Sequence, residues 1–326
     1  MRTRAVFFHE YGGPEVLRLE ETDIAAPGPG EALIRQSAAG VNYADIYLRG
    51  GQGIHEGPPL PSPIGLQGAG VVEAVGEGVG DVAPGDRVAY VGLLGGYAEA
   101  RLVPADRLVK LPEGFGEELA AATLLRGLTC EYLVRRLFQV KPGQTVLWHA
   151  AAGGVGVIGC QWAKALGATV IGTVGSDEKA ELARANGCDH AIVYTREDFV
   201  ARTMEITRGK GVEVVYDAVG RDTFMPSLEV LKPRGMIINF GTASGSVEPF
   251  PLQMLHRKSL IVSRPTLVSY IADRPEYMAA AQAFFDAAAR GDIRLEVGAR
   301  YPLAEASRAH ADMEARRTAG APVLIV

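Results

Sequence analysis

A single glycine-rich turn constrains the fold of this chain more than any other feature. The segment HAAAGGVGVIG, from His149 to Gly159, follows an apolar run at 145–148 and leads into a helical pattern at 155–166. A strand, a G-x-G-x-x-G turn and a helix in this order begin a βαβ unit that binds a dinucleotide. The helix N-terminus then offers free N–H groups and partial positive charge to the phosphates. The three glycines of the motif are Gly154, Gly156 and Gly159.

Each of these glycines has a separate expected role. The first permits the tight turn, the second lets the backbone approach the pyrophosphate, and the third lets the helix pack closely on the strand. The same pattern without a preceding strand and a following helix carries little weight, so its context decides the prediction.

Strands and helices alternate along the residues around and after this turn. Parallel strands need crossover connections, and helices supply them. The alternation therefore predicts an α/β fold with a Rossmann-type doubly wound parallel sheet. The expected strands are 145–148, 169–174, 191–194, 212–218, 236–240 and 260–263, and the expected helices are 155–166, 177–186, 198–207 and 223–231.

The chain before this region is rich in short apolar runs separated by turn signals such as Pro84-Gly85-Asp86. Such spacing predicts a folded-over sheet or small barrel. The C-terminal residues hold one expected helix, at 275–290, and too little else for a third domain. We therefore expect a β-rich domain at 1–125 that is completed by 270–326, and a dinucleotide-binding domain at 126–269.

The end of the second strand of the unit bears on the choice between NAD and NADP. A site for NAD normally places an acid there. Here the stretch reads GTVGS from Gly172 to Ser176, and Asp177 and Glu178 fall in the first turn of the next helix, where acids suit the dipole. Lys179 and Tyr194 are placed to meet a 2′-phosphate. The sequence favours NADPH, although a solvated Lys179 without this role is also compatible with the pattern.

Composition excludes several other classes of protein. The chain of 326 residues has a net charge of -5 and no run of like charges, which argues against a nucleic-acid footprint. No window approaches the ~18 apolar residues of a membrane span, and the apolar start is too short for a signal peptide. Its three cysteines, Cys130, Cys160 and Cys188, are far apart and form no metal-binding pair. We expect a cytoplasmic protein.

The chain resembles the medium-chain dehydrogenase/reductase superfamily and, within it, the quinone oxidoreductases related to zeta-crystallin. The resemblance runs nearly end to end and is carried by several short motifs. These are GGPEVL from Gly12, GVNYAD from Gly40, PGDRV from Pro84, the AAAGGVG turn, and YDAVG from Tyr216. It implies a GroES-like catalytic domain with an inserted Rossmann domain, and homodimers that pair through the sheet edge near Leu260-Ile261-Val262.

The resemblance also implies where NADPH binds. The residues at the pyrophosphate are Gly153, Gly154, Val155 and Gly156. Those at the adenosine end are Gly175, Ser176, Lys179, Tyr194 and Arg316. Those at the nicotinamide side are Phe240, Gly241, Thr242, Ala243, Thr266, Leu267 and Val268, with Thr129 and Asn42 facing the cofactor.

The positions that bind zinc in alcohol dehydrogenases of this superfamily carry other residues here. Asn42 replaces a cysteine, and Leu66-Gln67 replaces a His-Glu pair. Zinc needs a compact set of three or four N, S or O ligands, so no metal site is expected. His55, His149 and His310 are expected to be isolated surface or packed residues.

A metal-free enzyme of this kind suits an acceptor that takes hydride readily, such as a quinone. The protein then acts mainly by positioning the acceptor against the nicotinamide. Candidate catalytic residues are Asn42, Asp45 and Tyr47. The Tyr47 hydroxyl is the candidate donor to a developing oxyanion, although Tyr47 as a wall residue fits the sequence equally well.

Two alternatives stay open from the sequence. The same scaffold serves enone, alkenal or enoyl-thioester reductases, which share the cofactor site. A dinucleotide-binding structural or RNA-binding protein is the other, and the acidic balance of the chain argues against it.

Overall fold

The computed structural model describes residues 1–51, 57–315, 317–318 and 320–326. The chain forms two compact units. Unit 1 comprises residues 1–125, 273–281 and 295–326, and unit 2 comprises 126–272 and 282–294. The domain limits expected from the sequence differ from these units at residues 270–272 and 282–294, which they place with the first domain. As limits of functional domains they stay a prediction.

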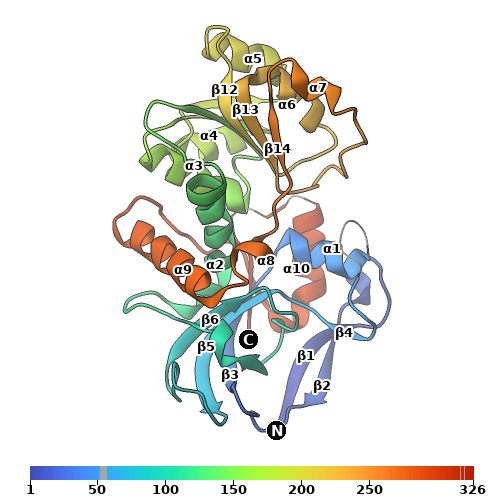
Figure 1. The fold of residues 1–326 in the computed structure, drawn as a ribbon. Helices are drawn as coiled ribbons and strands as arrows, with labels where there is room; N and C mark the ends of the chain where they lie inside the picture. Colours follow the sequence, from blue (N-terminus) through green and yellow to red (C-terminus); the bar gives the residue numbers. More distant parts are fainter. Residues whose placement is uncertain (52–56, 316, 319) are drawn as a thin grey trace. The chain divides into compact units, whose positions relative to one another are not determined.

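Unit 2 is built on a six-stranded sheet with the strand order β11-β10-β9-β12-β13-β14, all pairs parallel (Figure 1). Chain order thus runs outward from β9 in both directions, which confirms the predicted doubly wound sheet. The strands are β9 (Thr145–His149), β10 (Thr169–Val174), β11 (His190–Val193), β12 (Val212–Asp217), β13 (Leu231–Asn239) and β14 (Ile261–Ser263). The helices are α3 (Gly154–Ala165), α4 (Asp177–Ala185), α5 (Phe199–Ile206), α6 (Phe224–Val230), α7 (Gln253–His256) and α8 (Leu267–Tyr270).

Apolar strands explain why this sheet is covered by helices on both faces. Val146, Leu147 and Trp148 of β9 are fully buried, and so are Val214 and Val215 of β12. Strands that are apolar on both faces need cover on both faces, and βαβ crossovers provide it. One side of the sheet packs on α5 and α6 in a single apolar cluster that includes Ile171, Phe224 and Leu228.

Unit 1 holds two sheets. The larger has the order β15-β16-β3-β5-β6-β8, with β7 paired to β3, and the smaller has the order β2-β1-β4. The strands are β1 (Arg2–Phe8), β2 (Arg18–Asp23), β3 (Glu31–Gly40), β4 (Ser62–Pro63), β5 (Gln67–Val75), β6 (Arg87–Val91), β7 (Ala100–Pro104), β8 (Val109–Lys110), β15 (Arg300–Pro302) and β16 (Val323–Ile325). The helices are α1 (Tyr43–Gly50) and α10 (Ala306–Glu314), with short 3-10 turns η1 (Pro14–Val16), η2 (Ala105–Arg107) and η4 (Leu303–Glu305).

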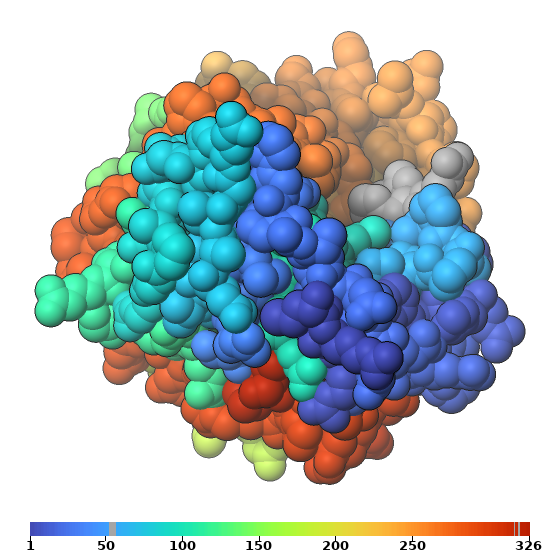
Figure 2. Space-filling model, turned by 90° about the horizontal axis from the view of Figure 1, so that it is seen from below, coloured from blue at the N-terminus to red at the C-terminus, as the bar shows by residue number. Residues whose placement is uncertain are grey.

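The C-terminal strand returns to the N-terminal part of the chain. β16 pairs antiparallel with β3, with Val323 opposite Gly40 and Ile325 opposite Ala38. Figure 2 shows red C-terminal residues beside blue and green residues of unit 1 on one face. This pairing is why the last residues belong to unit 1 and form no third core.

Two helical segments connect the units in sequence: α2 (Glu117–Glu131), and α9 (Arg274–Ala289), whose residues are divided between the units. Directly after α2 the chain forms a π-helix, η3 (Tyr132–Leu137), which the sequence does not predict. The strand β13 also begins earlier than predicted. It starts at Leu231, whereas the strand was expected at 236–240. Within the described ranges, none of the helices is long and apolar enough to cross a membrane.

Candidate cofactor and substrate site

The glycine-rich turn forms the start of α3 in unit 2. The N–H of Gly153 donates to the Ala150 carbonyl at 2.9 Å, and the N–H of Val157 donates to the Gly153 carbonyl at 2.8 Å. The N–H groups between them, those of Gly154, Val155 and Gly156, have no acceptor in the described part of the chain. Three free donors at the start of a twelve-residue helix suit a phosphate group.

The glycines of the motif serve different contacts. A Cβ on Gly159 would lie 2.1 Å from Cη2 of Trp148 on β9, so this glycine allows close helix-strand packing, as predicted. A Cβ on Gly156 would lie 2.3 Å from the Ala150 carbonyl oxygen, so this glycine closes the turn. The space above Gly154 is taken by a side chain: a Cβ there would lie 2.6 Å from Nε of Arg126.

Arg126 is a residue of this region that the sequence interpretation missed. It lies in α2 and is only 5% exposed, yet its guanidinium group stands beside the turn. A cation there adds to the positive end of α3. The local sequence does not indicate this role of Arg126, because only the fold brings Arg126 and Gly154 together. Thr129, one helical turn further along α2, is also buried.

The residues expected at the adenosine end lie together at the carboxyl ends of β10 and β11. A Cβ on Gly175 would lie 2.9 Å from the Tyr194 hydroxyl oxygen, so the tyrosine covers the glycine. Ser176 is the N-cap of α4, where its Oγ accepts from the N–H of Lys179 at 3.3 Å. Tyr194 remains about half exposed, and Lys179 is partly exposed. Arg316 lies outside the described residues.

Of the two acids that follow the second strand, Asp177 and Glu178, the first is already engaged. Both carboxylate oxygens of Asp177 accept from the Arg196 guanidinium, each at 2.6 Å. This bidentate pair lowers the pKa of Asp177. Asp177 is therefore neutralised locally, and Arg196, two residues beyond Tyr194, adds a cation that the sequence interpretation did not single out.

The opposite half of the sheet carries the loops expected at the nicotinamide side. Asp217, fully buried at the end of β12, accepts from the N–H groups of Val219 and Gly220 and from the hydroxyl of Thr223. The Asn239 amide donates to its other oxygen at 3.1 Å. These bonds fix the ends of β12 and β13. The segment after β13 consists of Phe240, Gly241, Thr242 and Ala243, and a Cβ on Gly241 would lie 2.5 Å from the Ala218 carbonyl.

A buried histidine braces the centre of this sheet. His149 Nδ1 lies 2.8 Å from the Thr173 hydroxyl, and its Nε2 lies 2.8 Å from the Ser227 hydroxyl. The Ser227 hydroxyl donates to the Thr223 carbonyl, so it accepts from Nε2–H, and Nδ1 accepts from Thr173. Burial lowers the pKa of His149 to about 4, so the ring is neutral at pH 7.

In unit 1 the candidate catalytic residues lie on and before α1. Asn42 precedes the helix and is buried, and its N–H donates to Oδ2 of Asp45 at 2.8 Å. The same Asp45 oxygen accepts from the Tyr97 hydroxyl at 3.0 Å. Tyr47, two residues after Asp45, is partly exposed, and its ring lies 6.3 Å from that of Tyr43, one turn earlier. These contacts give Asp45 a helix-capping role, and its catalytic role stays a prediction.

A second buried histidine supports this helix. His310 Nε2 lies 3.1 Å from the Tyr97 hydroxyl, and its Nδ1 lies 3.1 Å from Nη1 of Arg49. Arg49 is itself buried and pairs with Glu314 at 2.6 Å. Burial, followed by the charge of Arg49, lowers the pKa of His310 to about 3. Both described histidines expected to be isolated or packed are thus packed and hydrogen-bonded, and His55 lies outside the described residues.

At a position that carries a zinc ligand in related dehydrogenases, this chain has a residue with structural hydrogen bonds. Gln67 donates to the Ala121 carbonyl and accepts from the N–H of Leu125 at 3.0 Å. Over the described ranges, no three or more His, Cys, Asp or Glu side chains are grouped so as to hold a metal ion.

Comparison with known proteins agrees with this architecture. Residues 28–113 match the alcohol dehydrogenase GroES-like domain, and residues 154–284 match the family described as zinc-binding dehydrogenase. A parallel sheet with a glycine-rich turn, joined to a GroES-like unit, defines a medium-chain dehydrogenase/reductase.

Individual relatives narrow the assignment. The chain is 49% identical to a quinone oxidoreductase of Pseudomonas aeruginosa, over 99% of both chains. It is 43% identical to a 2-haloacrylate reductase of a Burkholderia species, over 98% of both. The crystal structure of Escherichia coli quinone oxidoreductase complexed with NADPH matches with a TM-score of 0.95 and 45% identity, over 99% of this chain and 100% of that one. The chain belongs to the quinone oxidoreductase family and is an oxidoreductase.

Proposed function

We propose that this protein binds NADPH on unit 2 and uses it to reduce a quinone-like acceptor. The observation that carries the proposal is the set of groups at the ends of β10 and β11. The Tyr194 hydroxyl lies beside Gly175, Lys179 stands in the first turn of α4, which follows Ser176, and Asp177 of the same turn is paired with Arg196. A 2′-phosphate suits the cations of this region, whereas the end of β10 itself carries no acid for the ribose of NAD.

The donors in unit 2 fit the rest of the cofactor. The free N–H groups of Gly154, Val155 and Gly156 would hold the pyrophosphate, with Arg126 beside them. The loops after β13 and β14, with Phe240–Ala243 and Thr266–Val268, would border the nicotinamide half, because ligands bind at the carboxyl ends of the strands on both sides of the switch point. When bound, NADPH supplies a hydride to the acceptor.

The residues of α1 would serve the acceptor. Tyr47 would donate a hydrogen bond to the oxygen on which negative charge develops. Asn42 would contact the cofactor and acceptor, and Asp45 would hold Asn42 through its backbone N–H. The names of the relatives support a quinone. The 2-haloacrylate reductase supports an activated alkene as the alternative acceptor.

The test is a panel of acceptors with both cofactors. Purified protein is mixed with NADPH or NADH and with 1,4-benzoquinone, an enone or 2-chloroacrylate, and cofactor oxidation is followed. We expect the highest kcat/KM with NADPH and the quinone. A higher kcat/KM with the alkenes would make an activated alkene the acceptor in place of the quinone. Absence of turnover despite NADPH binding would favour a binding protein.

We further propose a cytoplasmic homodimer that engages neither nucleic acid nor membrane. Its three cysteines are free and buried, which suits a reducing compartment. The apolar edge strand β14 supports the dimer.

A further inference from the structure

The short helix α8 follows the last strand of the sheet and is poorly supported by its own residues. It comprises Leu267–Tyr270, one turn, and none of its residues is buried. A single helical turn has no stability of its own in water. Some other part of the chain must therefore hold it.

Contacts from the π-helix η3 supply that support through Tyr270. The ring of Tyr132 stacks on the ring of Tyr270 with centroids 4.3 Å apart and planes 11° apart. The Arg136 guanidinium lies 4.9 Å from the same ring, and its Nη2 donates to the Tyr270 carbonyl at 2.9 Å. Tyr270 is thus held by a stacked ring, a cation and a hydrogen bond. We call these three residues the Tyr270 clamp.

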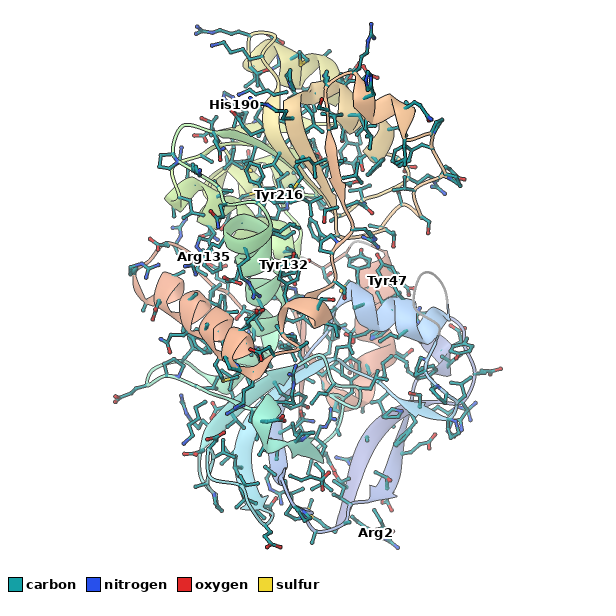
Figure 3. The ribbon with its side chains drawn as sticks, viewed as in Figure 1. Arg2, Tyr47, Tyr132, Arg135, His190 and Tyr216 are labelled. Carbon is teal, nitrogen blue, oxygen red and sulfur yellow. The ribbon has the colours of Figure 1, made fainter. Side chains whose placement is uncertain are left out.

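The clamp is itself anchored to the sheet. The hydroxyl of Tyr216, fully buried on β12, donates to the Leu133 carbonyl of η3 at 3.3 Å. Arg136 Nε lies 2.9 Å from the carboxylate of Glu131, which is also buried. Figure 3 labels Tyr132 on η3 and Tyr216 on the strand. The π-helical turn is therefore built onto the central strands, and α8 is built onto the π-helical turn.

The geometry of η3 departs from an α-helix where the clamp is made. The N–H of Phe138 donates to the Leu133 carbonyl at 3.3 Å, a step of five residues. π-Helical turns are rare, and those that occur are frequently found at functional sites. A turn of this kind directly opposite an otherwise unsupported helix points to a positioning role.

Topology gives α8 its place relative to the dinucleotide. It follows the carboxyl end of β14, in the half of the sheet beyond the switch point. Arg264, between β14 and α8, donates to the Asn239 carbonyl at the end of β13 at 2.8 Å. In a doubly wound sheet the adenosine half binds over the strands on one side of the switch point and the nicotinamide half over those on the other.

We infer that Tyr132, Arg136 and Tyr270 are positioning residues that fix Thr266–Val268 against the nicotinamide half of the cofactor. The inference rests on the proposed binding of NADPH. It assigns these residues no contact with the adenosine half, which binds over β10 and β11.

A pair of ligands separates this role from general stability. NADPH uses both halves of the site, whereas 2′,5′-ADP uses only the adenosine half and the 2′-phosphate pocket. Dissociation constants for both are measured with Tyr270→Ala, Arg136→Met and the matched control Tyr270→Phe, which keeps the ring and the carbonyl. Thermal unfolding confirms that each variant is folded.

We expect Tyr270→Ala and Arg136→Met to weaken NADPH about fivefold or more, the size of a lost aromatic or cation–π contact. Binding of 2′,5′-ADP should change less than about twofold in both variants. The control Tyr270→Phe should bind NADPH as tightly as wild type. Equal weakening of both ligands, or no weakening of either, would overturn the inference. Wild-type protein that binds 2′,5′-ADP but not NADPH would instead refute the proposed function.

Discussion

Lys179 is the side chain that we expect to decide between the two nicotinamide dinucleotides. It stands in the first turn of α4, where its backbone N–H donates to the Ser176 cap, and its partly exposed side chain carries the ammonium group that would meet a phosphate. Lys179→Ala should weaken NADPH by about 1.4–3 kcal/mol, or roughly 10- to 150-fold, and leave NADH nearly unchanged. Part of the difference should vanish at high salt, because an exposed ionic contact is screened.

Dissociation constants of wild type and variant for both cofactors check this prediction. Lys210→Ala, which removes an exposed lysine elsewhere in unit 2, is the control and should change neither constant. Equal weakening of NADH and NADPH would mean that Lys179 acts on the fold or on the pyrophosphate. Tighter binding of NADH by wild type would contradict the cofactor assignment.

Tyr47 is the candidate donor to the acceptor oxygen. Tyr47→Phe removes one hydroxyl and should lower turnover with a quinone on the order of tenfold, while the dissociation constant of NADPH stays the same. The control is Tyr43→Phe, which removes a hydroxyl from the same helix. The Tyr43 hydroxyl is engaged within the fold, because it donates to the Met313 carbonyl. Steady-state kinetics measure both. An unchanged rate in Tyr47→Phe would make Tyr47 a wall residue.

At the scale of elements, the packing of α3 on β9 depends on Gly159. A Cβ would lie 2.1 Å from Trp148, whose ring is fully buried and packs 4.4 Å from that of Tyr216. Gly159→Ala should therefore cost about 1–3 kcal/mol of unfolding free energy, despite the higher helix propensity of alanine. Urea denaturation checks it. Gly80→Ala, with no heavy atom within 4 Å of its Cβ, should be neutral or slightly stabilising.

The hydrogen bonds of His149 tie β9, β10 and α6 together only while the ring is neutral. Its pKa is about 4 in the fold, against 6.5 when exposed. Between these values the unfolded chain binds the extra proton, so stability should fall as pH drops from about 6.5 to 4, by about 1.4 kcal/mol per pH unit. Urea midpoints at pH 7.5 and 5.0 should therefore differ less in His149→Gln than in wild type. An equal difference in both would contradict the assignment.

The strands and helices of unit 2 could be predicted from the sequence because each depends on a local pattern of residues. The strand β12 was expected at 212–218 and lies at Val212–Asp217, since buried parallel strands are apolar runs with clear ends. The π-helix η3 was missed because its support comes from Tyr270, far along the chain. Arg126 and Arg196 were missed for the same reason: their positions depend on contacts that no spacing rule reports.

At the scale of the whole molecule, the sheet of unit 2 has two unlike edges. At one edge, β14 exposes Ile261 by 47% and Val262 by 36%, and Leu252 and Met254, in the segment that precedes it in the chain, are exposed by 73% and 49%. At the other edge, β11 begins with the exposed His190 (Figure 3). An apolar edge strand with unpaired backbone groups invites pairing with another strand. A second copy of β14 related by a two-fold axis would continue the sheet and cover the apolar side chains.

A charge placed on β14 should therefore separate the subunits. Light scattering at micromolar concentration should give twice the chain mass for wild type and the mass of one chain for Ile261→Lys, because the lysine would be desolvated or would hold the edges apart. His190→Lys places the same side chain on the opposite edge of the same sheet and should leave the dimer intact. A monomeric wild type, or a dimer that survives Ile261→Lys, would show that β14 is not the interface. Dissociation by His190→Lys as well would place the interface at the β11 edge or spread it over both edges.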